Sequence, residues 1–561
     1  MQRHRLTPYL LIGLLVASAS PAVAQAPATS QPTLDQVIEK VTQAEMELIE
    51  RTKSLRPIME AYIQELGAEV DGVQMPTVDT YFLGRLEWRE GPVLSLMANA
   101  NRVGQSAGER RGFLPDGFAA MAAPDWKSME RARYDFKLVR REFLGDVRTM
   151  VFDVAPKQGP TTGFSGRIWV EDRGYNIVRY NGVNRNVKGP RFRKKVYLHV
   201  DGWRVNSGTG VWVPAYVHCE ETGLDGQTKN SKSALVRSQV KLWGYNTEKT
   251  DESQQFTAIQ IAEASVQDAT DQTQLTPVAS QRRWEQEAEM NVVERLEKAG
   301  LLAPAGEVEK VLDTVLNNLQ ATNDIALERP VRARVLLTSP LESFTVGHTL
   351  VLSRGLIDVL PDEASLAMAL AHELSHVVLG HNLIDTKFAF ADRMMIGDAE
   401  LLATIAMHRD PKEETEADAK VMEMLERSPY KDKLASAGLF LRIIGERAKL
   451  LPELIQPHVG DHVSSKDAQR LVELMTRSPE LKHRDLTQVP ALPIGARLVV
   501  DPWDGRLELL RSAAALPGAM REKAPLAITP LTPHLRYANG GAAPIEPRPN
   551  MPRASSSNAT S

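Results

Sequence analysis

Residues 372–376 read His-Glu-Leu-Ser-His, and the rest of the chain is best interpreted outward from them. Two histidines four residues apart on a helix place both imidazoles on one face, where they can hold a single metal ion. An apolar-rich run from Asp362 to Gly380 predicts a buried helix around them. Ionisable groups are costly in a buried helix unless they are paired or bound to metal. The stretch therefore predicts a metal site, with Glu373 beside the metal as the group that moves a proton.

A catalytic zinc site usually takes a third ligand from the protein and keeps a fourth position open. The metzincin spacing is excluded, because it requires Gly and His where this chain has Leu379 and Asn382. A second helical run downstream puts Glu414 and Asp418 one turn apart on one face. Glu414 suits the third ligand, and Asp418 suits the carboxylate that accepts the ring N–H of a ligating histidine. Two neighbouring carboxylates are alternatives for the ligand, Glu413 and Glu416. Without a metal, an acidic first turn of this helix is the ordinary explanation.

These motifs resemble a known family, the zinc metallopeptidases typified by HtpX, BepA, Oma and the CAAX prenyl endopeptidases. The matching segments are residues 351–358, 362–364, 370–377, 380–381 and 414–418. The resemblance covers roughly residues 280–480. It implies an α+β fold with a mainly helical, gluzincin-like catalytic domain and a small sheet. It also implies one Zn²⁺ per chain, bound by His372, His376 and Glu414, with Glu373 as general base and acid.

The resemblance implies further site residues on both sides of the helix. An extended substrate is expected to add as a β-strand to an edge strand formed by Thr349, Leu350, Val351, Leu352 and Ser353. Before this strand the family commonly has Asn-Ala-Phe, where this chain has residues 342–344, Glu-Ser-Phe. Family members often carry a later His-Pro element, whose nearest match here is His462-Val463. His462 is therefore expected to be an oxyanion stabiliser or auxiliary active-site histidine, with an exposed loop histidine as the alternative and His458 as a weaker rival.

Residues 1–24 predict a secretory signal peptide. A basic start at residues 1–5 is followed by an apolar stretch at residues 9–16 and by Ala-Val-Ala at residues 22–24, a small-x-small cleavage site. A membrane anchor is the less favoured alternative, because the apolar stretch falls short of the roughly 20 residues that span a bilayer. We therefore expect a periplasmic protein, with secretion as the less favoured alternative.

Composition predicts a soluble globular protein. The 561 residues are 43% hydrophobic and 25% charged with a net charge of −4, which suits two or three domains and indicates no nucleic-acid partner. Cys219 is the only cysteine, so no intrachain disulfide can form. We expect no transmembrane span in the mature chain, because its apolar stretches are interrupted by charges. Peripheral contact with a membrane and the oligomeric state are left open by the sequence.

The predicted organisation begins with a linker and an amphipathic helix over residues 25–75, the helix running from Leu34 to Leu66. Residues 76–250 change to a period of two and predict an antiparallel β-rich domain. Residues 166–179 resemble strands of LolA-like lipoprotein carriers, which implies a pocket for lipid or lipoprotein. A structural or substrate-presenting role for this domain is the favoured interpretation.

The remaining segments are predicted as a linker at 251–277, the zinc metallopeptidase domain at 278–485, a hairpin with a short helix at 486–515, and a disordered tail at 516–561. The resulting prediction is a periplasmic zinc endopeptidase that hydrolyses unfolded or misassembled envelope proteins, in quality control. The alternative is a periplasmic lipoprotein-binding, lipid-binding or chaperone-like protein with a latent protease core. The complete ligand set with Glu373 favours catalysis.

Overall fold

The structure is a computed structural model of the chain. It describes residues 32–70, 73–98, 114–127, 129–144, 147–158, 163–184, 197–206, 212–222, 235–245, 277–381, 410–448, 450–455, 459, 471–481, 498–500 and 507–509. The predicted signal peptide, His462, His458 and the C-terminal tail lie outside these residues. Within them, no helix is both long and apolar enough to cross a bilayer.

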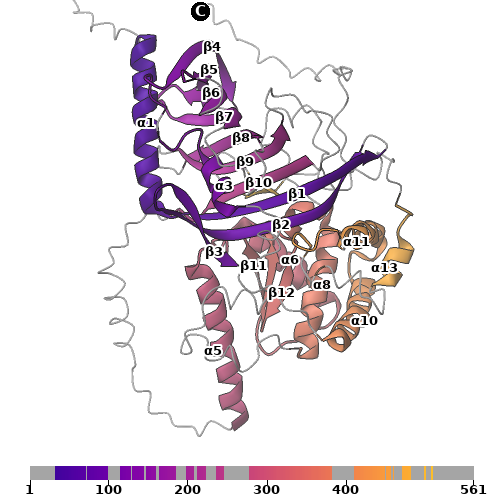
Figure 1. The fold of residues 1–561 in the computed structure, drawn as a ribbon. Coiled ribbons are helices and arrows are strands. Elements are labelled where there is room, and N and C mark those ends of the chain that lie inside the picture. Colours follow the sequence, from indigo (N-terminus) through magenta and orange to yellow (C-terminus); the bar gives the residue numbers. More distant parts are fainter. Residues whose placement is uncertain are drawn as a thin grey trace, which may run out of the picture.

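The N-terminal part is one large antiparallel sheet with a helix along it (Figure 1). The helices are α1 (Leu34–Leu55), α3 (Pro115–Ala119) and the 3-10 turn η1 (Ala120–Ala122). The strands are β1 (Ile58–Val70), β2 (Val73–Trp88), β3 (Pro92–Ala98), β4 (Tyr134–Leu144), β5 (Val147–Pro156), β6 (Phe164–Glu171), β7 (Ile177–Asn184), β8 (Tyr197–Asn206), β9 (Trp212–Thr222) and β10 (Leu235–Trp243). Their order is β3-β2-β1-β10-β9-β8-β7-β6-β5-β4, so the first strand in sequence pairs with the last one, β10. The predicted antiparallel β region is confirmed, but it begins at Ile58 and not at residue 76.

The helix predicted from Leu34 to Leu66 is wrong beyond Leu55. Arg56 caps α1 in the left-handed conformation, and Pro57 has no N–H with which to continue the helix. Residues from Ile58 onward instead form β1, although their Glu, Gln, Ala and Leu content favours helix. Pairing with β2 on one side and β10 on the other supplies backbone partners that a local pattern does not reveal.

α1 closes the inner face of the sheet. Val37 and Val41 pack into a core that includes Met59, Phe82 and Tyr180. A fully buried ion pair adds to this packing, because Glu45 of α1 accepts hydrogen bonds from both terminal nitrogens of Arg204 on β8. The inner face is therefore filled by the protein's own side chains over the strands that α1 covers.

The C-terminal part is mainly helical with a small mixed sheet, so the predicted α+β class is confirmed at this level. Its helices are α5 (Pro277–Lys298), α6 (Glu307–Thr322), α7 (Arg354–Val359), α8 (Glu363–Leu379), α10 (Pro411–Arg427), η4 (Lys431–Lys433), α11 (Leu434–Ala448) and α13 (Val472–Arg477). The strands are β11 (Arg332–Leu336), β12 (Ser343–Val346) and β13 (Thr349–Ser353). The predicted hairpin is also present, as β14 (Leu498–Val500) and β15 (Leu507–Leu509).

The prediction that residues 349–353 form an edge strand for substrate binding is wrong. Thr349, Leu350, Val351, Leu352 and Ser353 form β13, the central strand of the order β11-β13-β12. β13 pairs in parallel with β11 and antiparallel with β12, so its backbone is hydrogen-bonded on both sides and cannot accept a further strand. In this sheet β12 is an outer strand, and it contacts α8.

The two parts of the chain share one apolar core. Ile58, Tyr62 and Leu83 of the large sheet pack in the same cluster as Leu341 and Phe344 of the C-terminal part. Figure 1 shows α6, α8 and α11 close to β1 and β2. The large sheet therefore forms a wall of the helical part rather than a separately tethered module.

Candidate metal centre

α8 carries the His-Glu-Leu-Ser-His stretch at the centre of the C-terminal part. It begins at Asp362, whose side chain accepts the backbone N–H of Ser365 at 2.9 Å, and it ends at Gly380 in the left-handed conformation. Both ends therefore have the cap residues that the sequence predicted. The helix is buried all round from Ala364 to His376, which places ionisable side chains in the interior.

α10 brings the third side chain to this point. Asp410 caps its start, Pro411 occupies the first turn, and the helix packs against α8. Glu414 lies on its buried face with Ala417 and Val421. Among the described residues, one group of side chains has the arrangement of a metal site, and it consists of His372, His376 and Glu414. Two neighbours do not join it: Glu413 is half-buried and Glu416 is exposed.

The spacing of the three side chains fits a tetrahedral ion. Nε2 of His372 and Nε2 of His376 are 3.0 Å apart. Oε2 of Glu414 lies 3.3 Å from the first, and Oε1 of Glu414 lies 3.7 Å from the second; taking one ligand atom from each residue, all three lie within 4.8 Å of one another. Ligand atoms bound to Zn²⁺ tetrahedrally at about 2.0–2.1 Å are about 3.3 Å from one another. His372, His376 and Glu414 therefore fit the Zn²⁺ ion that the sequence predicted.

The far side of each imidazole also has a partner. Nδ1 of His372 lies 3.4 Å from Oδ1 of Asp418, the residue predicted for this task. Nδ1 of His376 lies 3.1 Å from Nδ1 of His381, whose Nε2 lies 3.3 Å from a carboxylate oxygen of Glu416. With Nδ1 occupied in this way, both Nε2 atoms are left to face Glu414 as metal ligands would.

Sequence reasoning assigned His381 no role, although its Gly-His pair was part of the resemblance. The signal was local. Gly380 adopts a φ of 74°, and this left-handed residue turns the chain so that the backbone N–H of His381 donates to the carbonyl of His376 at 2.9 Å. The turn places the His381 ring beside His376 on α8.

The electrostatic environment suits a cation. Burial alone lowers the pKa of His372, but hydrogen bonds to Asp418 and Glu414 and the charges of Glu414 and Glu373 outweigh it and raise the pKa to about 9. The same carboxylates that stabilise a positive imidazole would stabilise a divalent ion at this position.

Glu373 lies one residue from the first ligand and is almost fully buried, at 1% exposure. The hydroxyl of Ser343 on β12 donates a hydrogen bond of 2.8 Å to its Oε1. A buried carboxylate held next to a candidate metal site can act as a general base.

Among curated proteins, none matches the chain. Several solved structures match, and two of them are similar over 36% of the chain. A crystal structure of MucB in complex with MucA(peri) shares 9% identity over 93% of that chain, with a TM-score of 0.13. The Pseudomonas aeruginosa MucA/MucB complex shares 10% identity over 94% of that chain, with a TM-score of 0.14. TM-scores this low support no argument about fold, so the LolA-like resemblance stays a prediction. Residues 303–404, which include α8, match the model of Peptidase family M48 and indicate a metallopeptidase.

Proposed function

We propose that this chain is a zinc-dependent endopeptidase with a gluzincin-like catalytic domain. One observation carries the proposal: His372, His376 and Glu414 converge at tetrahedral spacing in the interior, with Glu373 next to them on the same helix. The match of residues 303–404 to a peptidase family supports the same chemistry.

Zn²⁺, when bound, supplies a Lewis acid that polarises a peptide carbonyl and makes a water molecule acidic near neutral pH. The protein's own residues do the rest. Glu373 takes a proton from the attacking water and passes it to the leaving amine. Asp418 and His381 hold the two ligand imidazoles in one tautomer and one orientation.

We propose that substrates are polypeptides bound in extended form along β12. Among the described strands β12 is an outer strand of this sheet, and it begins at Ser343, the residue that contacts Glu373. A peptide lying beside the start of β12 would be next to the general base.

Location and duty extend the proposal. The basic, apolar and small-x-small segments of residues 1–24 support export to the periplasm. The resemblance to envelope and membrane-associated metallopeptidases supports hydrolysis of unfolded or misassembled envelope proteins, as quality control.

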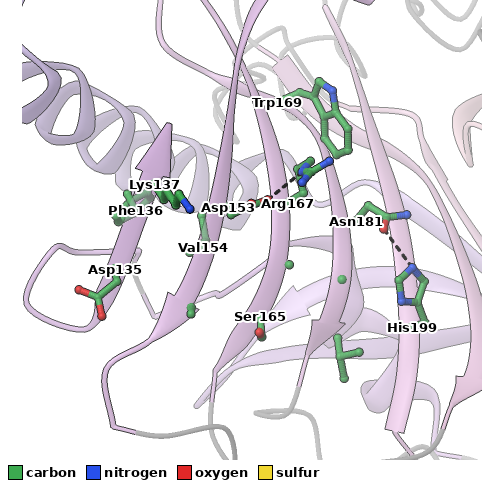
Figure 2. Close-up of a pocket in the computed structure, with 14 residues that line it drawn as sticks. Asp135, Phe136, Lys137, Asp153, Val154, Ser165, Arg167, Trp169, Asn181 and His199 are labelled. Carbon is green, nitrogen blue, oxygen red and sulfur yellow. Dashed lines mark hydrogen bonds and ion pairs between the residues drawn. The ribbon is translucent and has the colours of Figure 1, made fainter. Parts of the chain in front are cut away.

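Lipid or lipoprotein binding by the large sheet has less support. The inner face is filled by α1 and its core partners. A hollow of ≈ 690 Å³ on the sheet crosses β4 to β8 (Figure 2). An Arg167–Asp153 ion pair and a hydrogen bond between His199 and Asn181 lie across it. An acyl chain in this hollow would remove water from Arg167 and Asp153 and offer these charged groups no hydrogen bond in return.

The deciding experiment compares cleavage of an unfolded model protein by the full chain and by Glu373→Gln, with zinc measured in both. We expect about one zinc per chain in each sample and cleavage by the wild type alone. Glu413→Gln is the matched control, since it changes a carboxylate of the same turn as Glu414 that stays out of the cluster. A zinc-loaded wild type that cleaves no unfolded substrate would contradict the proposal.

A further inference from the structure

Ser343 has a contact that the reaction described above does not use. Its hydroxyl donates to Oε1 of Glu373 at 2.8 Å, and both residues are buried, at 2% and 1% exposure. This hydrogen bond connects the first residue of β12 to a residue within α8, two elements that are separate in sequence. A serine at the start of a strand has no general need to reach a carboxylate on a neighbouring helix.

The backbone before Ser343 is fixed at several points. The side chain of Ser353 on β13 accepts the N–H of Glu342 at 3.0 Å and donates to the carbonyl of Pro340 at 2.6 Å. The N–H of Leu341 donates to the carbonyl of Leu454 at 2.6 Å. The hydroxyl of Ser343 is therefore carried by a segment that is held on both faces.

The large sheet supplies a further anchor for this segment. The backbone N–H of Ser339 donates to Glu60 of β1 at 2.9 Å, and its hydroxyl accepts from Lys241 of β10 at 2.8 Å. Glu60 also accepts from the hydroxyl of Tyr81 on β2 at 2.9 Å. These contacts explain how a strand of four residues can present one hydroxyl at a constant position.

We propose that Ser343 is a positioning residue that holds the Glu373 carboxylate in the orientation needed for proton transfer. The proposal rests on the proposed function of Glu373 as general base. A glutamate side chain has several rotatable bonds, and a hydrogen bond to one carboxylate oxygen fixes where the other oxygen points.

The test uses the zinc-loaded full chain and the variants Ser343→Ala and Ser343→Thr. We expect Ser343→Ala to lower kcat about 10- to 100-fold, while KM and zinc content stay at wild-type values. Ser343→Thr keeps the hydroxyl and is expected to restore most of kcat. In the Glu373→Gln background, Ser343→Ala is expected to add no further loss, because it acts through Glu373.

Ser375→Ala is the matched control. Ser375 is fully buried on α8, but its hydroxyl donates to the carbonyl of Ala371 on its own helix at 2.7 Å. This variant removes an equivalent hydroxyl without touching Glu373, so its kcat should stay within about threefold of the wild type. A Ser343→Ala enzyme with wild-type kcat would overturn the proposal.

Crystal structures of the zinc-loaded wild type and of Ser343→Ala separate this inference from the proposed function. We expect Glu373 to leave its wild-type rotamer, or to occupy several rotamers, only in Ser343→Ala. If the wild type cleaves nothing, the proposed function fails, and the rotamer comparison alone decides the role of Ser343. An unchanged Glu373 in Ser343→Ala would overturn that role.

Discussion

Nδ1 of His376 lies 3.1 Å from Nδ1 of His381, and His381 in turn reaches Glu416 at 3.3 Å. An imidazole that binds a metal through Nε2 carries its proton on Nδ1, so with the proposed metal bound His376 would donate to His381, and His381 would donate to Glu416. In that state the exposed carboxylate of Glu416 would set the tautomer of His381 and, through it, that of His376. His372 has the simpler arrangement, with Asp418 beside its Nδ1.

His381→Ala should weaken zinc binding about 10- to 100-fold, because His376 loses the partner that orients its ring. Competition with a chelator of known affinity measures this effect. His199→Ala, on the large sheet, is the control and should bind zinc as the wild type does. An unchanged zinc affinity in His381→Ala would show that the contact between the two rings does not orient His376.

Removal of zinc should lower the thermal stability of the chain. Without the ion, His372, His376, Glu373 and Glu414 remain together in the interior, where desolvation of charge is costly. A ligand present at 1,000 times its Kd stabilises the folded state by about 4 kcal/mol. We expect a chelator to lower the unfolding midpoint by several degrees and added zinc to restore it.

Glu414→Ala provides the control for this effect. The variant lacks one of the three ligands, so its unfolding midpoint should respond weakly to chelator or zinc. Equal midpoints for zinc-loaded and zinc-free wild type, with binding verified on the same samples, would rule out a folded-state metal site at these residues.

The site was predictable largely because its main signals are local. The four-residue spacing of His372 and His376 acts within one helix, and the caps at Asp362 and Gly380 mark where that helix starts and stops. The pairing of α10 with α8 is not local, and its prediction depended on the need for a third ligand, on the one-turn spacing of Glu414 and Asp418, and on the resemblance. The contact between Ser343 and Glu373 was missed because no spacing rule connects a strand residue to a helix residue 30 positions later.

Strand order was the main failure at the site. A period of two identifies residues 349–353 as a strand but does not tell whether it lies at an edge or in the middle. That depends on β11 joining in parallel from one side and on the turn at Gly347, with φ of 56°, folding β12 onto the other. The β1 error has the same origin, since the residues of β10 that pair with β1 lie 169 to 185 positions later in the sequence.

The buried pair of Glu45 and Arg204 provides a test of how α1 is held. Removing one partner leaves a buried charge uncompensated, which costs about 3–5 kcal/mol. Glu45→Ala should therefore lower the free energy of unfolding by about this amount in urea titrations. The double variant Glu45→Met and Arg204→Met should recover most of the loss, since it buries no charge.

Glu47→Ala is the matched control, because Glu47 lies on the same helix but is exposed. Its effect should stay within about 0.5 kcal/mol. A Glu45→Ala variant as stable as Glu47→Ala would mean that the pair contributes nothing to the attachment of α1.

Asp79 of β2 makes the contact between the large sheet and the C-terminal part sensitive to pH. Its carboxylate accepts the backbone N–H groups of Glu453 at 3.2 Å and Leu454 at 2.8 Å. Burial raises the pKa of Asp79 to about 7, and this effect exceeds the lowering by the two N–H groups. Between about pH 4 and pH 7 the folded state therefore binds a proton that the unfolded state has lost.

A raised carboxyl pKa makes the free energy of unfolding fall as pH rises through this window, and the loss is complete above about pH 7. Two pH units correspond to about 3 kcal/mol, so Asp79 should cost the wild type roughly that amount between pH 5 and pH 8. Asp79→Asn cannot ionise and should lack this component. Urea unfolding of both proteins at the two pH values measures the difference of differences, which cancels other titrating groups. The same pH dependence in Asp79→Asn and wild type would mean that the Asp79 carboxyl is already ionised in the folded state at pH 5.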